Sequence, residues 1–160
     1  MLAVPFALLV TGAGAWGPLV FAAIGSMVAA AGGWYLTARR RAIAAFRAAH
    51  RDSGKDLVIV YTDSPHWKEY IETRWLPRWG HRAVVLDRSR PWNFDQPEAR
   101  LWQAVAGSVE HTPVVIIVPA HGRVHVVRFW LAFRDFKHGK DRKLREAEVR
   151  LAKLLDEPPS

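Results

Sequence analysis

The chain has 160 residues, which is enough for about one domain and an appendage. Half of its residues are apolar, and 23 lysines and arginines against 15 acidic residues give a formal net charge of +8. The absence of cysteine excludes disulfides, thiolate catalysis, cysteine-ligated zinc and thiol redox chemistry. No charged side chain precedes Arg39, so the N-terminal part of the chain differs in kind from the rest.

The segment Met1–Ala38 is predicted to be a transmembrane helical anchor. It exceeds the ~20 residues with which a helix crosses a bilayer, and the best span covers residues 19–38. Trp34 and Tyr35 would lie at one membrane interface, and arginines follow at once, as at a cytoplasmic boundary. This pattern places the rest of the chain on the cytoplasmic side of the cell's inner membrane. The arginines are Arg39, Arg40 and Arg41.

The start of the anchor leaves alternatives open. The composition of Gly12–Pro18 favours a turn, so that Met1–Ala15 and 19–38 would form a short helical hairpin with Trp16 near the far interface. A single span with an apolar extension is the alternative. A cleaved signal peptide is the third interpretation, although it normally has a charged start and a shorter apolar run. Small residues give the span a surface on which another helix can pack closely. They include Gly25, Gly32 and Gly33.

Hydrophobic patterning after the anchor predicts alternating strands and helices. A basic juxtamembrane helix and linker over residues 39–54 comes first. Apolar, β-branched runs typical of buried strands then alternate with helical stripes, and Asp95 with Glu98 resembles a capping box. The segment Trp130–Lys140 is interpreted as a basic loop. The predicted strands are Leu57–Tyr61, Ala83–Leu86, Val114–Val118 and Val124–Phe129, and the helical stripes cover 67–79, 95–105 and 144–155.

The order of these elements predicts an α/β domain over residues 55–156, followed by a tail at 157–160. Two strand–helix–strand crossings, then a hairpin and a closing helix, specify a mixed four-stranded sheet with helices on both faces.

This order, with Thr112-Pro113 opening the third strand, resembles the thioredoxin-like family. The resemblance covers Lys55–Asp156. It implies that Asp63-Ser-Pro-His66 occupies the place of the family's CxxC motif and that Pro113 is the cis-proline which packs against that motif. Both cysteines are missing, so the disulfide exchange that defines the family cannot occur. The link from Trp130 to Lys140 is also longer than is usual in the family. We therefore expect no enzyme activity and no cofactor.

One corner of the predicted sheet gathers the candidate site residues, which we interpret as a vestigial active site. In this interpretation Asp63 or Ser64 caps the helix that follows. The alternative is a metal site in which a carboxylate joins two imidazoles, those of His66 and His111. A hydrolytic triad is disfavoured, because residues so close along one turn seldom converge. The corner comprises Asp63, Ser64, Pro65, His66, Thr112 and Pro113.

Other residues point to partners. Trp79 and Trp92 lie beside predicted element ends, where we expect them to be exposed, and they are the candidate partner contacts. His121 and His125 flank a hairpin turn and are interpreted as solvated. The basic cluster Lys137–Arg145 lacks the aromatic residues of a nucleic-acid module, so we expect no nucleic acid and assign the cluster to anionic lipid headgroups.

Together these features predict a non-catalytic, membrane-anchored accessory subunit that stabilises a larger membrane protein complex. Energy-transducing complexes, respiratory or photosynthetic, are natural hosts for a small subunit of this kind. The alternative is a metal- or thiol-peptide-binding protein, or an enzyme, that uses the former active-site corner.

Overall fold

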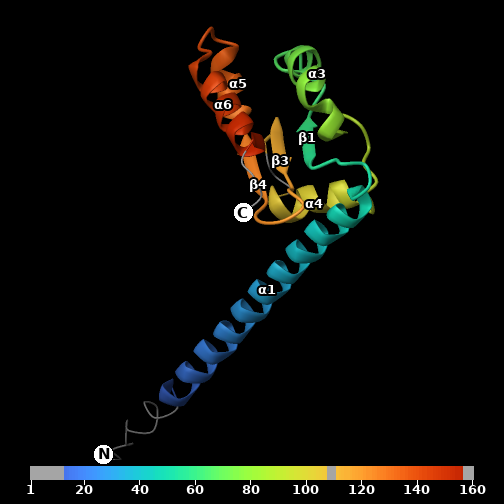
Figure 1. The fold of residues 1–160 in the computed structure, drawn as a ribbon. Helices are drawn as coiled ribbons and strands as arrows, with labels where there is room; N and C mark the ends of the chain where they lie inside the picture. The colour runs from blue at the N-terminus through green and yellow to red at the C-terminus, as the bar shows by residue number, and fades with distance from the viewer. Residues whose placement is uncertain (1–12, 108–110, 157–160) are drawn as a thin grey trace, which may run out of the picture. The chain divides into compact units, whose positions relative to one another are not determined.

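The computed structural model describes residues 13–107 and 111–156 (Figure 1). The chain divides into two compact units, Met1–Ala38 and Arg39–Ser160. The first helix, α1 (Ala13–His50), contributes residues to both units.

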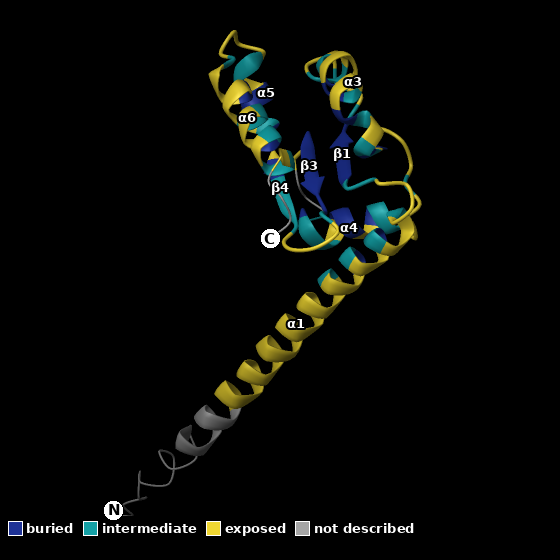
Figure 2. Ribbon diagram, in the orientation of Figure 1, coloured by how far each residue is buried: buried dark blue, intermediate teal, exposed yellow. Residues whose placement is uncertain are grey.

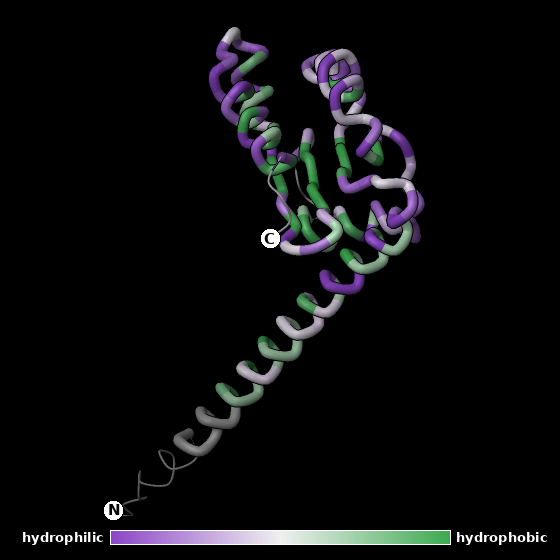
Figure 3. The backbone as a smooth tube through the Cα atoms, in the orientation of Figure 1, coloured by the Kyte–Doolittle hydropathy of each residue, from purple (hydrophilic) through white to green (hydrophobic). Residues whose placement is uncertain are grey.

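In the N-terminal unit, α1 is helical from Ala13 onward, through Pro18. The turn expected at Gly12–Pro18 is therefore wrong from Ala13 on. Of the expected first arm, Met1–Ala15, residues 1–12 lie outside the described residues. All side chains from Val20 to Ala38 are exposed and nearly all are apolar or small (Figures 2 and 3). By length and composition, the stretch Val20–His50 is able to cross a membrane.

Two aliphatic hydroxyl groups on this stretch bond to its own backbone. Ser26 Oγ donates to the carbonyl of Ala22 at 2.8 Å, and Thr37 Oγ1 donates to the carbonyl of Gly33 at 2.7 Å. Such bonds satisfy the hydroxyl donors inside the helix, which an apolar environment requires.

The second unit is built on a mixed four-stranded sheet of order β2-β1-β3-β4. β1 runs parallel to β2 and antiparallel to β3, and β4 is antiparallel to β3. The predicted mixed sheet is confirmed, and every strand falls within one residue of its predicted bounds. The strands are β1 (Leu57–Tyr61), β2 (Ala83–Asp87), β3 (Val114–Ile117) and β4 (His125–Arg128).

Helices cover both faces of this sheet, because side chains alternate between the faces along each strand. Leu57, Ile59 and Tyr61 of β1 pack in one core, with Trp75 and Phe133 from the helices. The other β1 residues pack in the second core. The helices on the first face are α2 (Lys68–Tyr70), the π-helical η2 (Ile71–Trp75), α3 (Leu76–Trp79), α5 (Trp130–Phe136) and α6 (Arg142–Asp156). A 3-10 turn, η3 (Gly80–Arg82), leads into β2.

The second core lies on the opposite face, under α4 (Pro97–Val105) and the last turns of α1. Phe46 is 1% exposed there, against Val58 and Val60 of β1 and Trp102 of α4. The end of α1 is therefore part of the core of the second unit, and it positions the arginines that follow the apolar segment.

Two local expectations are wrong. The segment expected to be a basic loop contains α5, whose Ala132 and Phe133 are buried in the first core. The capping box at the start of α4 does not form, since Gln96 is the N-cap and makes no side-chain capping bond. Asp95 and Glu98 form ion pairs instead, with Arg100 and His50. The His50–Glu98 pair ties the end of α1 to α4.

Candidate functional site

The pairing of β1 with β3 brings the predicted corner residues to one end of the sheet. Val60 of β1 lies opposite Val114 of β3, so the segment after Tyr61 begins at the end where Pro113 enters β3. Thr112 and Pro113 are buried and joined by a cis peptide bond. The other corner residues are less covered. Asp63, Pro65 and His66 are exposed and Ser64 is half-buried.

The polar groups of this corner are occupied by local partners. The Asp63 carboxylate forms an ion pair with Lys68, and this hydrogen bond raises the pKa of the lysine. The Asp63 backbone N–H donates to Ser89 Oγ at 2.6 Å, and the His66 N–H donates to Ser64 Oγ at 3.4 Å. The expected side-chain cap is not found, because the N-cap of α2 is Trp67 and no side chain bonds there.

The candidate metal ligands are not assembled. Among the described residues, no three His, Cys, Asp or Glu side chains group closely enough to hold a metal ion. His111 instead stacks on the Trp130 ring, with centroids 4.8 Å apart and planes 26° apart, and the Arg134 guanidinium lies 5.3 Å from the same ring.

The two candidate contact tryptophans differ. Trp79 is only 6% exposed and packs on Trp75, so the exposure expected from its place at a helix end is wrong. Trp92 is half-buried, and its indole N–H donates to the Asp87 carbonyl at 2.7 Å. It lines a hollow of about 350 Å³ with Trp102 and the exposed Phe94. Two arginines complete this hollow, which we call the aromatic hollow. They are Arg88 and Arg90.

The predicted membrane-interface residues lie on α1. Trp34 and Tyr35 are 78% and 56% exposed. Arg40 and Arg41 are exposed and Arg39 is half-buried, while the side chain of Trp16 lies outside the described residues. At the three small positions an added Cβ would meet nothing within 4 Å, so this face of the helix is open. The positions are Gly25, Gly32 and Gly33.

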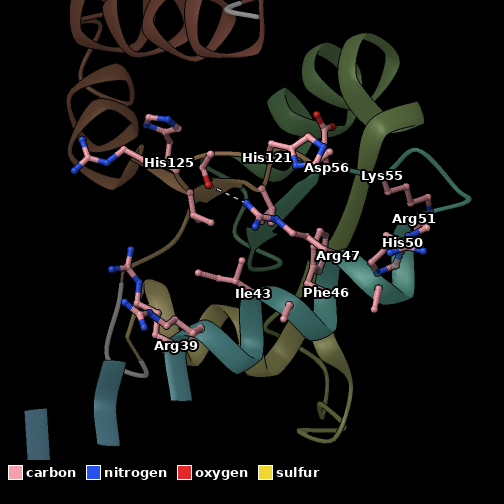
Figure 4. Close-up of a pocket in the computed structure, with 18 of the residues that line it drawn as sticks. Arg39, Ile43, Phe46, Arg47, His50, Arg51, Lys55, Asp56, His121 and His125 are labelled. Atoms are coloured by element: carbon pink, nitrogen blue, oxygen red, sulfur yellow. Dashed lines mark hydrogen bonds between the residues drawn. The ribbon is translucent and has the colours of Figure 1, made fainter. Parts of the chain in front are cut away.

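A feature that sequence reasoning missed lies at the opposite end of the sheet. The last turns of α1, the segment that leads into β1 and the β3–β4 turn enclose a groove of about 1300 Å³ (Figure 4). Six of its lining residues are arginine or lysine, three are histidine and one, Asp56, is acidic. We call it the basic groove. Its guanidinium and ammonium groups belong to Arg39, Arg40, Arg47, Arg51, Lys55 and Arg123.

Arg47 holds the walls of the basic groove together. Its Nε donates to the Pro119 carbonyl at 2.9 Å. A terminal nitrogen donates to the Gly122 carbonyl, also at 2.9 Å (Figure 4, dashed line). Asp56 pairs with Arg82, outside the groove lining, and that hydrogen bond raises the pKa of Arg82. The one carboxylate of the lining is therefore already neutralised.

The remaining groove cations have no such partner. Within the described residues, none of them forms an ion pair with a carboxylate. These cations are those of Arg39, Arg40, Arg51, Lys55 and Arg123. The Nε of Arg39 is also buried, with no hydrogen-bond partner in the part of the chain that is described. The sequence contains two signs of this groove, the arginines that follow Ala38 and the basic hairpin turn at 121–125. They are far apart in the sequence, and only the fold brings them together.

No known protein family, curated protein or solved structure matches this chain. Function is therefore argued from its own residues.

Proposed function

We propose that this chain is a membrane-anchored, non-catalytic accessory subunit that stabilises a larger membrane protein complex. The observation that supports it most directly is the surface of α1, where Phe21, Met27 and Trp34 are 77%, 73% and 78% exposed. Large apolar side chains exposed along a helix need lipid or other helices around them. The arginines after Ala38 favour a second unit on the cytoplasmic side of the inner membrane. Respiratory and photosynthetic complexes are the hosts to examine first.

A thioredoxin-like fold for the second unit is part of the proposal. The chain order of β1, α2–α3, β2, α4, β3, β4 and α6 supports it, as does the cis bond at Pro113. The helix α5, inserted between β4 and α6, departs from the family pattern.

A non-catalytic role fits the chemistry at the corner. Asp63 is paired with Lys68, and His66 is exposed to solvent rather than oriented by a third group. General acid–base or nucleophilic catalysis needs such orientation. The alternative function, binding of a metal or a thiol peptide at this corner, has less support in the geometry.

The aromatic hollow is the contact surface that we propose for the second unit. Aromatic rings beside arginines are the residue types enriched at the centres of protein interfaces. Trp92 packs edge-on against Trp102, with ring centroids 5.1 Å apart, and its ring also contacts that of Phe94. The hollow therefore presents a fixed aromatic surface.

Co-migration after mild detergent extraction tests the proposal. We expect the unmodified chain to migrate in a stoichiometric complex, and Gly25→Leu with Gly32→Leu to reduce its retention. An added Cβ at either glycine meets no atom within 4 Å among the described residues, so a loss reports on a neighbouring helix. Ala23→Leu with Ala30→Leu is the matched control, since it has the same spacing on the opposite side of the helix. An unmodified chain that migrates alone overturns the proposal.

A further inference from the structure

We propose that the basic groove binds the phosphate headgroup of an anionic phospholipid. This inference rests on the membrane anchoring in the proposed function, but it assigns a specific site that is independent of any partner protein. The groups that the groove would recognise are the phosphate oxygens and the apolar part of the lipid next to them.

The charge balance of the groove points to an anion. Asp56 is paired with Arg82, which leaves the groove with a strong excess of positive charge. Like charges held this close repel one another, and a bound oxyanion relieves that repulsion. Guanidinium groups suit phosphate in particular, because they donate two parallel hydrogen bonds to its oxygens.

The groove is also held in place before any ligand arrives. Phe46 anchors the helical wall in the core. The two bonds of Arg47 fix the opposite wall, which is the β3–β4 turn, and Figure 4 draws the bond to Gly122. A site with fixed walls loses little conformational freedom on binding. The buried, unpartnered Nε of Arg39 is a donor that an acceptor in the groove would satisfy.

Two features favour a lipid over a soluble phosphate. Arg39, the first lining residue, directly follows the exposed apolar segment that ends at Ala38, and basic residues at such a position meet anionic headgroups. The half-buried Ile43 and Val124 add apolar surface to the lining, which suits the glycerol and acyl part of a lipid.

The test measures binding of fluorescent phosphatidylglycerol to the full chain in neutral detergent micelles. We expect saturable binding that unlabelled phosphatidylglycerol displaces and phosphatidylcholine does not. Arg51→Gln with Arg123→Gln should weaken it about 25-fold, since each cation contributes about fivefold. Both side chains are exposed and neither supports the core, so the fold should be retained.

The matched control is Arg150→Gln with Lys153→Gln, which removes the same charge from exposed positions on α6, outside both the groove and the basic cluster Lys137–Arg145. We expect less than about a twofold change in this control. An equal loss in both pairs, or equal displacement by phosphatidylcholine, overturns the groove assignment. If inorganic phosphate at the same concentration displaces the labelled lipid, the ligand is a soluble phosphate and the assignment to a lipid is wrong.

These outcomes are separable from those of the proposed function. Binding is measured on the isolated chain and co-migration on the native complex. Failure of lipid binding leaves a stoichiometric complex standing, and a chain that migrates alone leaves saturable lipid binding standing.

Discussion

The two ends of the sheet differ in how their charges are balanced. At the end where β1 finishes, the exposed Asp63 is neutralised by Lys68. At the end where β1 begins, the one acidic lining residue is paired with Arg82, and five groove cations have no carboxylate partner among the described residues. The carboxylate at the first end is thus balanced by a nearby cation, whereas the second end keeps an excess of positive charge. A fold does not fix where function lies.

The largest expected effect concerns the wall of the basic groove. Phe46→Ala should lower the free energy of unfolding by about 3–5 kcal/mol, because it leaves a cavity beneath the helix. Phe46 is 1% exposed and packs against β1 and α4 residues. Chemical denaturation of the full chain in neutral micelles measures the loss.

The control for that prediction is Phe94→Ala, which removes a 54% exposed ring and should cost under about 1 kcal/mol. If both variants lower the free energy of unfolding by the same small amount, the end of α1 does not belong to the core of the second unit.

Arg47→Met should lower the free energy of unfolding by about 2 kcal/mol, since it removes two hydrogen bonds from a charged donor and leaves two carbonyls unpaired. Lys68→Met, at the other end of the sheet, breaks an exposed ion pair and should change stability by less than about 0.5 kcal/mol. Thermal or denaturant unfolding of the two variants compares the two ends of the sheet directly. Equal losses of stability would show that the Arg47 bonds contribute no more than the exposed ion pair of Lys68.

The strands could be predicted from the sequence because their information is local. Val114–Ile117 is a continuous β-branched run bounded by Pro113, and such a run is typical of a strand that is buried on both faces. The helix α5 could not be predicted in this way. It is only seven residues long, and although most of them are apolar, charged residues follow directly at Arg134 and Lys137. Phe133 gains its core position from tertiary packing. Trp79 carried a usable signal, since it follows Trp75 at helical spacing on the buried face.

The candidate sites divide in the same manner. The corner lies within two short segments joined by strand pairing, so the order of strands was enough to place Asp63 near the end where Pro113 enters β3. The basic groove draws its lining from residues 39–51, 54–56 and 118–125. Its positive charge is visible in the sequence only as separate arginines, and their lack of carboxylate partners becomes apparent only when the fold is known.

Alkaline pH should lower the stability of the fold, because two tyrosines of the first core ionise more readily in the unfolded chain. Tyr61 donates to Glu72 at 3.1 Å and Tyr70 donates to Glu148 at 3.0 Å. Burial, and then these hydrogen bonds, raise the pKa of each phenol to about 12. The unfolded chain loses these protons near pH 10, so stability is complete below pH 10 and falls as the pH rises toward 12.

Tyr61→Phe with Tyr70→Phe should flatten that part of the pH profile, by an effect on the order of 1 kcal/mol per tyrosine. Denaturant unfolding at intervals from pH 8 to pH 12 measures it, and the substitution leaves lysine titration in place as an internal reference. A slope unchanged in the double variant would show that the phenols are not held neutral by the fold.

The smallest effect is expected at the corner where Asp63 and His66 lie. Asp63→Ala with His66→Ala should change the free energy of unfolding by less than about 0.5 kcal/mol, because both side chains are exposed and the one ion pair lost is on the surface. The activity and metal content of the host complex should also stay unchanged. The matched variant is Ser64→Ala, which removes only the acceptor of the His66 N–H. A defect in activity or metal content, with folding and assembly intact, would show that the corner is a functional site. That result would leave the proposal for the basic groove unchanged, because the groove lies at the other end of β1.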